Sequence, residues 1–201
     1  MMKRLFLFPA LFGFAFSSYG SVVLSENFDE LADAIDTTSV GAFHTINGTN
    51  VDIVGETLFV GLCKAPESGN CIDMNGTFGD PQGQLQSNML FGPGNYLLSF
   101  DLIGSQRGFT DSVTVTFGSY DQTFTLASDN TTSGIVTNQP VTLTSPGYLL
   151  FASDVPGYVG LLLDNVVVST VPEPSSLLPL AGAMLAGVFA VRGRRRRTMI
   201  S

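Results

Sequence analysis

Hydrophobic and polar residues alternate along several short stretches in the middle of the chain, with turn-forming residues between them. The clearest stretch is 111–117, where two valines and a phenylalanine share one face and hydroxyl side chains occupy the other. Alternation with a period of two predicts a β-strand that is buried on one side. The stretch 122–126 repeats the pattern, so residues 118–121 are predicted to form the turn of a hairpin.

More strands are predicted along the rest of this middle part. No stretch between residues 40 and 170 has the sustained periodicity of a helix, which argues against an α/β fold. About eight to ten short strands over roughly 150 residues favour an all-β fold, a two-sheet sandwich of the jelly-roll type. The remaining predicted strands span 51–62, 85–91, 95–103, 141–144, 148–152 and 158–168.

The N-terminus has a different pattern from the middle. Two basic residues precede an apolar run over residues 5–16, and small residues stand just before Ser21. These three zones predict a secretory signal helix that is removed during export. The expected domains are therefore a signal peptide at 1–20 and a β-sandwich at 21–170.

The C-terminal segment, residues 171–201, combines a polar motif, an apolar stretch and a basic cluster. Pro-Glu-Pro at 172–174 leads into an apolar stretch at about 175–191. That stretch is just long enough to cross a bilayer as a helix, and the arginines after it would stay on the cytoplasmic side. These physical features alone fit a permanent membrane anchor equally well. The basic cluster consists of Arg192, Arg194, Arg195, Arg196 and Arg197.

The order of these three features resembles the PEP-CTERM sorting signal of Gram-negative bacteria that make exopolysaccharide. The resemblance covers about residues 171–197. It implies that exosortase, an integral membrane enzyme, recognises Pro172, Glu173 and Pro174 and separates the domain from its helix. The protein would then be anchored only transiently in the inner membrane. It would afterwards reach the cell surface or the extracellular matrix, where exopolysaccharide is the expected partner.

The charge of the middle part is strongly acidic. Every acidic residue except Glu173 lies between residues 21 and 172, with only Lys64 and Arg107 as basic residues there. Nucleic-acid binding is excluded for this part, since contact with phosphates requires clustered basic side chains. Arg107 is expected either to pair with a nearby carboxylate such as Asp111 or to contact an acidic polysaccharide.

The two cysteines of the chain lie close together in the sequence. Cys63 and Cys71 enclose seven residues rich in turn formers, and export would place them in an oxidising compartment. A disulfide that closes a surface loop is predicted. Zinc binding is the alternative, but two cysteines and one histidine are fewer than the four ligands of a structural zinc site.

Three segments of the middle part, at residues 68–76, 96–108 and 163–166, carry a second resemblance. They resemble exported bacterial sandwich domains of the carbohydrate-binding, galactose-binding-like kind. This resemblance implies a structural Ca²⁺ held by Asp164 together with Glu26 or Asp29. The residues alone leave two roles open for Asp164, which interrupts an apolar strand and needs a partner when buried. Either a cation or backbone N–H groups at a bulge would supply that partner.

Nothing in the sequence points to catalysis. His44 is the single histidine, and no nucleophile is visibly arranged around it in the sequence. The sequence contains no Gly-x-Ser-x-Gly, His-Glu-x-x-His or glycine-rich phosphate-binding motif. We therefore expect a noncatalytic surface or matrix protein and no enzyme. The alternatives are a carbohydrate-binding module, which the absence of tryptophan disfavours, and a secreted hydrolase.

Overall fold

The structure is a computed structural model that describes residues 20–77 and 82–171. Residues Gly20–Val171 form one compact unit. The predicted signal helix, the Pro-Glu-Pro motif, the predicted transmembrane helix and the arginine cluster lie outside the described residues. Within the part of the chain that is described, we find no helix with the length and apolar character needed to cross a membrane.

The described residues form thirteen β-strands. Their bounds are β1 (Val22–Glu26), β2 (Ala34–Thr37), β3 (Ser39–Val40), β4 (Phe43–Thr45), β5 (Val51–Val54), β6 (Cys71–Asp73), β7 (Gln84–Ser87), β8 (Gly94–Ile103), β9 (Asp111–Phe117), β10 (Tyr120–Leu126), β11 (Val136–Leu143), β12 (Leu150–Ser153) and β13 (Leu162–Thr170).

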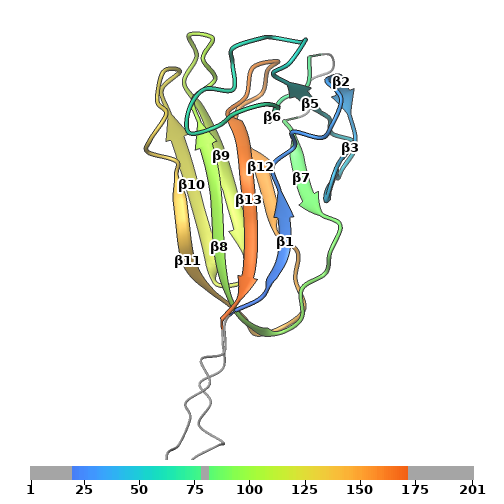
Figure 1. Ribbon diagram of the computed structural model, residues 1–201, viewed down its shortest axis with the longest axis vertical. Helices are drawn as coiled ribbons and strands as arrows, with labels where there is room; N and C mark the ends of the chain where they lie inside the picture. The colour runs from blue at the N-terminus through green and yellow to red at the C-terminus, as the bar shows by residue number, and fades with distance from the viewer. Residues whose placement is uncertain (1–19, 78–81, 172–201) are drawn as a thin grey trace, which may run out of the picture. The chain divides into compact units, whose positions relative to one another are not determined.

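These strands make two antiparallel sheets that pack as a sandwich (Figure 1). One sheet has the order β11-β8-β13-β6-β5-β2, and β1 is added to it by pairing with β13. The other sheet has the order β10-β9-β12-β7-β4-β3. The prediction of an all-β, two-sheet sandwich is therefore confirmed.

The hairpin of β9 and β10 forms where the alternating pattern predicts it. Phe124 of β10 lies opposite Val113 of β9, and both side chains are buried in the core. The exposed face carries hydroxyl pairs, such as Thr114 Oγ1 and Thr123 Oγ1 at 2.7 Å. The turn is tighter than predicted, because Phe117 and Tyr120 already face each other across it.

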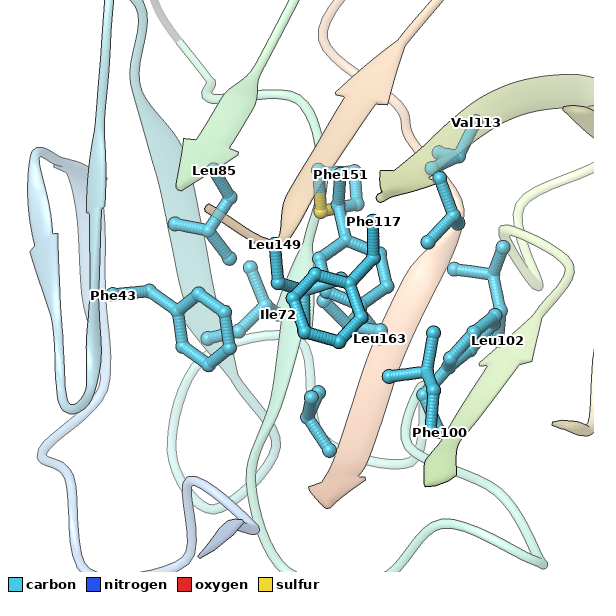
Figure 2. Packing of buried hydrophobic residues seen from close by; sticks show 14 of the residues in the cluster. Phe43, Ile72, Leu85, Phe100, Leu102, Val113, Phe117, Leu149, Phe151 and Leu163 are labelled. Carbon is cyan, nitrogen blue, oxygen red and sulfur yellow. The ribbon is translucent and has the colours of Figure 1, made fainter. Parts of the chain in front are cut away.

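The core between the sheets is built around phenylalanine rings from both sheets. Phe151 of β12 contacts Phe100 of β8 across the sandwich, with ring centroids 5.3 Å apart and planes at 88°. It also contacts Phe43 of β4 edge-on at 6.2 Å. Edge-to-face contacts of this kind add to the stabilisation that burial provides. Figure 2 shows aliphatic side chains, including Ile72 and Leu163, that fill the space around these rings.

The two ends of the domain meet at one end of the sandwich. The backbone N–H of Thr170 donates to the carbonyl of Ser21 at 2.9 Å, and the backbone N–H of Ser21 donates to Thr170 Oγ1 at 3.1 Å. β1 runs away from this end and β13 runs back to it (Figure 1). The loops at the opposite end are called the distal loops below. They comprise residues 27–33, 55–70, 104–110, 127–135 and 154–161.

Candidate functional site

Asp164 lies where β13 departs from regular pairing. The register between β13 and β8 shifts between Asp164 and Val167, which is a β-bulge, and Asn165 has a φ of 53°. The backbone N–H of Asn165 donates to Asp164 Oδ1 at 2.6 Å, and the backbone N–H of Ser68 also donates to this carboxylate. Backbone donors at a bulge, one of the two partners predicted for Asp164, are therefore present.

A second carboxylate faces Asp164 from the neighbouring strand. Asp101 of β8 lies directly opposite Asp164 in the register. The side-chain amide of Asn165 donates to Asp101 Oδ2 at 2.9 Å and to Asp164 Oδ2 at 3.3 Å. One neutral amide thus bridges two acidic groups, and it adds no positive charge to balance them.

Glu67 brings a further buried carboxylate to the same place. Its side chain is only 3% exposed, and neither of its carboxylate oxygens has a hydrogen-bond partner among the described residues. Burial, together with the charges of Asp164 and Asp101, raises the pKa of Glu67 to about 10. Burial and the charges of Asp29 and Asp101 raise the pKa of Asp164 to about 7, against the backbone hydrogen bonds. We call Asp29, Glu67, Asp101 and Asp164 the acidic cluster.

Of the two acidic residues that the sequence predicts as partners of Asp164, only Asp29 interacts with it among the described residues. Asp29 accepts hydrogen bonds from the backbone N–H of Asn70 at 3.2 Å and from the amide of Asn27 at 2.7 Å, and its charge acts on Asp164. Glu26 is engaged elsewhere. Its two oxygens accept hydrogen bonds from the backbone N–H groups of Phe28 at 3.1 Å and Ala42 at 2.8 Å.

The residues of the acidic cluster fit a hard divalent cation. Ca²⁺ prefers carboxylate and carbonyl oxygens, and an unpaired buried carboxylate is costly. The two unpartnered oxygens of Glu67 are the observation that supports this fit. Sequence reasoning missed Glu67 because its loop gives no pattern that places it beside Asp164. A Ca²⁺ site that includes Asp29 and Asp164 stays a prediction.

A disulfide holds the loop that carries Glu67. Cys63 and Cys71 are bonded to each other, as predicted. Among the described residues, the one group of three potential ligand atoms within 4.8 Å is formed by Cys63, Glu67 and Cys71. Sulfurs bonded to each other are not thiolate ligands, so this group is no metal site in the oxidised protein. An ion held by three carboxylates of the acidic cluster would have to draw them closer together.

Arg107 forms a local ion pair, but its partner differs from the one expected. Its guanidinium pairs with Asp73 of β6, not with Asp111. Asp73 is fully buried and also accepts hydrogen bonds from the backbone N–H groups of Gly160 at 2.7 Å and Asn75 at 3.2 Å. Burial raises the pKa of Asp73 to about 7, although Arg107 and these backbone donors act in the opposite direction.

The inward position of Arg107 limits what it offers to a ligand. Its guanidinium carbon lies 5.6 Å from the centre of the Phe59 ring, and only 19% of its side chain is exposed. A contact between Arg107 and an acidic polysaccharide stays a prediction. His44 of β4, for its part, is hydrogen-bonded through Nδ1 to the side chain of Asn88 at 2.7 Å.

No protein-family model matches this sequence, and no curated protein matches it significantly. Among solved structures, the chain is similar to the K3 cleaved adhesin domain of Lys-gingipain from Porphyromonas gingivalis W83. That match has 17% identity, a TM-score of 0.51, and covers 76% of this chain and 100% of the other. The K1 cleaved adhesin domain of the same protein matches with 15% identity, a TM-score of 0.48 and coverage of 76% and 99%.

A CBM22-1 xylan-binding domain from Paenibacillus barcinonensis matches with 16% identity, a TM-score of 0.44 and coverage of 78% and 99%. Of these three matches, the one to the K3 adhesin domain is close enough in structure to support a conclusion about fold. At its identity it shows the fold alone, because one fold hosts many unrelated functions. The chain is therefore placed among β-sandwich domains.

Proposed function

We propose that this chain is a noncatalytic, exported surface or matrix protein of a Gram-negative bacterium. Exosortase releases it from the inner membrane at Pro172, Glu173 and Pro174, and it then associates with exopolysaccharide. The observation that carries the proposal is the meeting of Ser21 and Thr170 at one end of the sandwich. The signal peptide precedes the first of these residues and the sorting motif follows the second.

This arrangement suits a domain that is cut at both ends. Removal of the segments before Ser21 and after Val171 leaves β1 and β13 paired, because their hydrogen bonds involve only residues of the domain. The distal loops lie at the end of the sandwich opposite to Ser21 and Thr170 (Figure 1). A released or tethered domain would therefore present the same distal loops to the matrix.

The hydrogen bonds of the polar residues support a noncatalytic domain. Asp73 is bound by Arg107, and the carboxylate of Glu26 holds two backbone N–H groups. His44 is paired with an asparagine and not with a serine or cysteine in the described part of the chain. Catalysis by a Ser-His or Cys-His pair requires the nucleophile within hydrogen-bond reach of the base.

The proposal includes one structural Ca²⁺, held by Asp29, Glu67 and Asp164. A bound Ca²⁺ would bring two positive charges to these carboxylates and would be coordinated by the oxygens of Glu67, which have no hydrogen-bond partner among the described residues. Two contacts support the proposal: the disulfide closes the loop that carries Glu67, and the backbone N–H of Ser68 in that loop donates to Asp164. Without a cation their mutual repulsion is relieved only by protonation.

The sorting step is tested in the native host. Alanine replaces Pro172, Glu173 and Pro174 together, and a control variant carries alanine at Ser175 and Ser176 instead. We expect the motif variant to remain in the inner-membrane fraction, while the wild type and the control reach the cell surface. Release of the motif variant in the same amount as wild type would refute recognition of this motif.

A second candidate function is direct sugar binding by the sandwich domain. The observation that favours it is the exposure of aromatic side chains on the distal loops, with Phe109 57% and Tyr158 67% exposed. Retention of the purified protein on its host's exopolysaccharide, with and without Ca²⁺, tests this function. Absence of retention under both conditions would count against it.

A further inference from the structure

The distal loops enclose a cleft beside the start of β9. It has a volume of about 200 Å³ and lies between the loop 104–110 and the loop 154–161. That volume suits one ring of a small molecule. The lining residues are Phe109, Thr110, Asp111, Val155, Pro156, Gly157, Tyr158 and Val159.

Large apolar side chains line this cleft and remain exposed to water. Phe109 is 57% exposed, Tyr158 67% and Val155 37%. Tyr120, on the β9–β10 hairpin, is by contrast only 8% exposed. Exposed apolar patches that surround a cleft are typical of ligand-binding sites, because a ligand then covers the apolar surface.

A carboxylate provides the polar group of the cleft. Asp111 is 2% exposed and accepts the backbone N–H of Ser112 on Oδ1 at 2.7 Å. Asp111 is also one of the residues that line the cleft. Burial, with the charge of Asp154 as a smaller contribution, raises the pKa of Asp111 to about 6, so the group is mostly ionised at pH 7. It can therefore accept hydrogen bonds from hydroxyl groups of a ligand.

The charges around the cleft determine which ligands it tolerates. Asp111 and Asp154 are both acidic, and the nearby Arg107 is already paired with Asp73. A uronic acid or another anion would be repelled, since no free cation faces the cleft among the described residues that line it. A sugar ring without charge has an apolar C–H face for stacking and hydroxyl groups for a carboxylate.

We propose that this cleft binds one uncharged pyranose unit of a glycan, with Phe109 and Tyr158 stacking on the ring and Asp111 accepting its hydroxyl groups. The inference rests on the proposed association with exopolysaccharide and specifies the sugar class and the residues. This assignment is separate from the contact between Arg107 and an acidic polysaccharide, which stays a prediction.

Isothermal titration calorimetry of the full chain, in a detergent without a sugar headgroup, tests the proposal. The probes are neutral β-glucan, mannan and galactan hexasaccharides, with alginate and polygalacturonate fragments as anionic probes. We expect at least one neutral probe to bind and both anionic probes to fail. Phe109→Ala and Tyr158→Ala should each weaken binding about tenfold, because each removes a stacking surface.

Tyr148→Ala is the matched control, because Tyr148 is 41% exposed but lies outside the cleft. Its affinity should equal that of the wild type. Asp111→Asn should weaken binding as well, and thermal unfolding of each variant verifies that the fold is intact. Equal affinity of wild type, Phe109→Ala and Tyr158→Ala would overturn the proposal, as would preferential binding of an anionic probe or binding of none.

A further outcome would also overturn the proposal: the wild type binds no sugar but forms a dimer, and Tyr158→Ala disrupts that dimer. This result would indicate that a second copy of the chain covers the cleft. The failure of the proposed function has a different signature. If the wild type and the cleft variants are retained equally on the host exopolysaccharide, the cleft assignment fails and the matrix association stands. If none of them is retained, the association itself fails.

Discussion

Replacement of Glu67 by glutamine gives opposite predictions for the calcium-free and calcium-bound protein. In the calcium-free protein the raised pKa, about 10, keeps the Glu67 carboxyl protonated at pH 7. Glutamine has nearly the same shape and is also neutral, and its amide can donate to Asp164 or Asp101. We therefore expect Glu67→Gln to unfold at the same temperature as the wild type, or higher, in the presence of a chelator.

Ca²⁺ should raise the unfolding temperature of the wild type more than that of Glu67→Gln. A ligand that binds only the folded state at a hundred times its Kd stabilises that state by about 2.7 kcal/mol. For a domain of this size, 1 kcal/mol shifts Tm by about 2–4 °C, so the wild type should gain about 5–11 °C. Glu67→Gln loses a charged ligand from a site where both of its oxygens lack other partners, and most of this gain should disappear.

Differential scanning calorimetry at pH 7, with chelator, Mg²⁺ or Ca²⁺, measures these shifts. Glu26→Gln is the control, because Glu26 holds backbone N–H groups and not the cluster. It should lower Tm in every condition, by the loss of hydrogen bonds worth about 1–3 kcal/mol, and keep the full gain from Ca²⁺. The reasoning would be refuted by an equal gain in Glu67→Gln, by loss of the gain in Glu26→Gln, or by no gain in the wild type.

Three further changes test other parts of the structure. Arg107→Met leaves Asp73 buried without its cation and should cost about 3–5 kcal/mol in urea unfolding, whereas a loss below about 1 kcal/mol would contradict the ion pair's role. The pKa of Asp111 rises from 3.8 to about 6 on folding, so the folded state favours the protonated carboxyl. The contribution of Asp111 to stability is therefore complete below about pH 4 and is lost as the pH rises through 6. Thermal unfolding between pH 4 and 7 should show a weaker decline for Asp111→Asn, and an unchanged decline would argue against the shift. Serine at both Cys63 and Cys71 should cost about 2–3 kcal/mol in urea unfolding, and wild-type stability of that variant would mean that the disulfide does not restrain the chain.

The sequence identifies strands that are long and buried on one side. β9 matches its predicted bounds, because seven residues in strict alternation leave little choice of register. β6 was not predicted, since its three residues are all buried and give no alternation. β13 begins at Leu162 and not at 158, because Gly160 belongs to a loop whose backbone N–H binds Asp73.

Some residues of the candidate sites are recognisable from the sequence, and others are recognisable only from the structure. Asp164 stands out in the sequence because it interrupts an apolar strand, and the bulge in β13 explains its position. Glu67 and Asp73 become recognisable only after folding, when residues far apart in the sequence meet. The partner of Arg107 lies 34 positions away, whereas the carboxylate nearest in sequence is Asp111. Spacing along the chain cannot rank such pairs, because long-range contacts follow from the order of strands in the sheets.

The intact mass of the mature protein tests the central claim most directly. The protein is recovered from the outside of its own host and from the same host without exosortase. We predict a chain that begins at Ser21 and ends close to Pro172–Pro174 in the first host, and a chain that retains its C-terminal segment in the second. A mass that extends to Ser201 in both hosts would contradict the account and identify the segment as a permanent anchor.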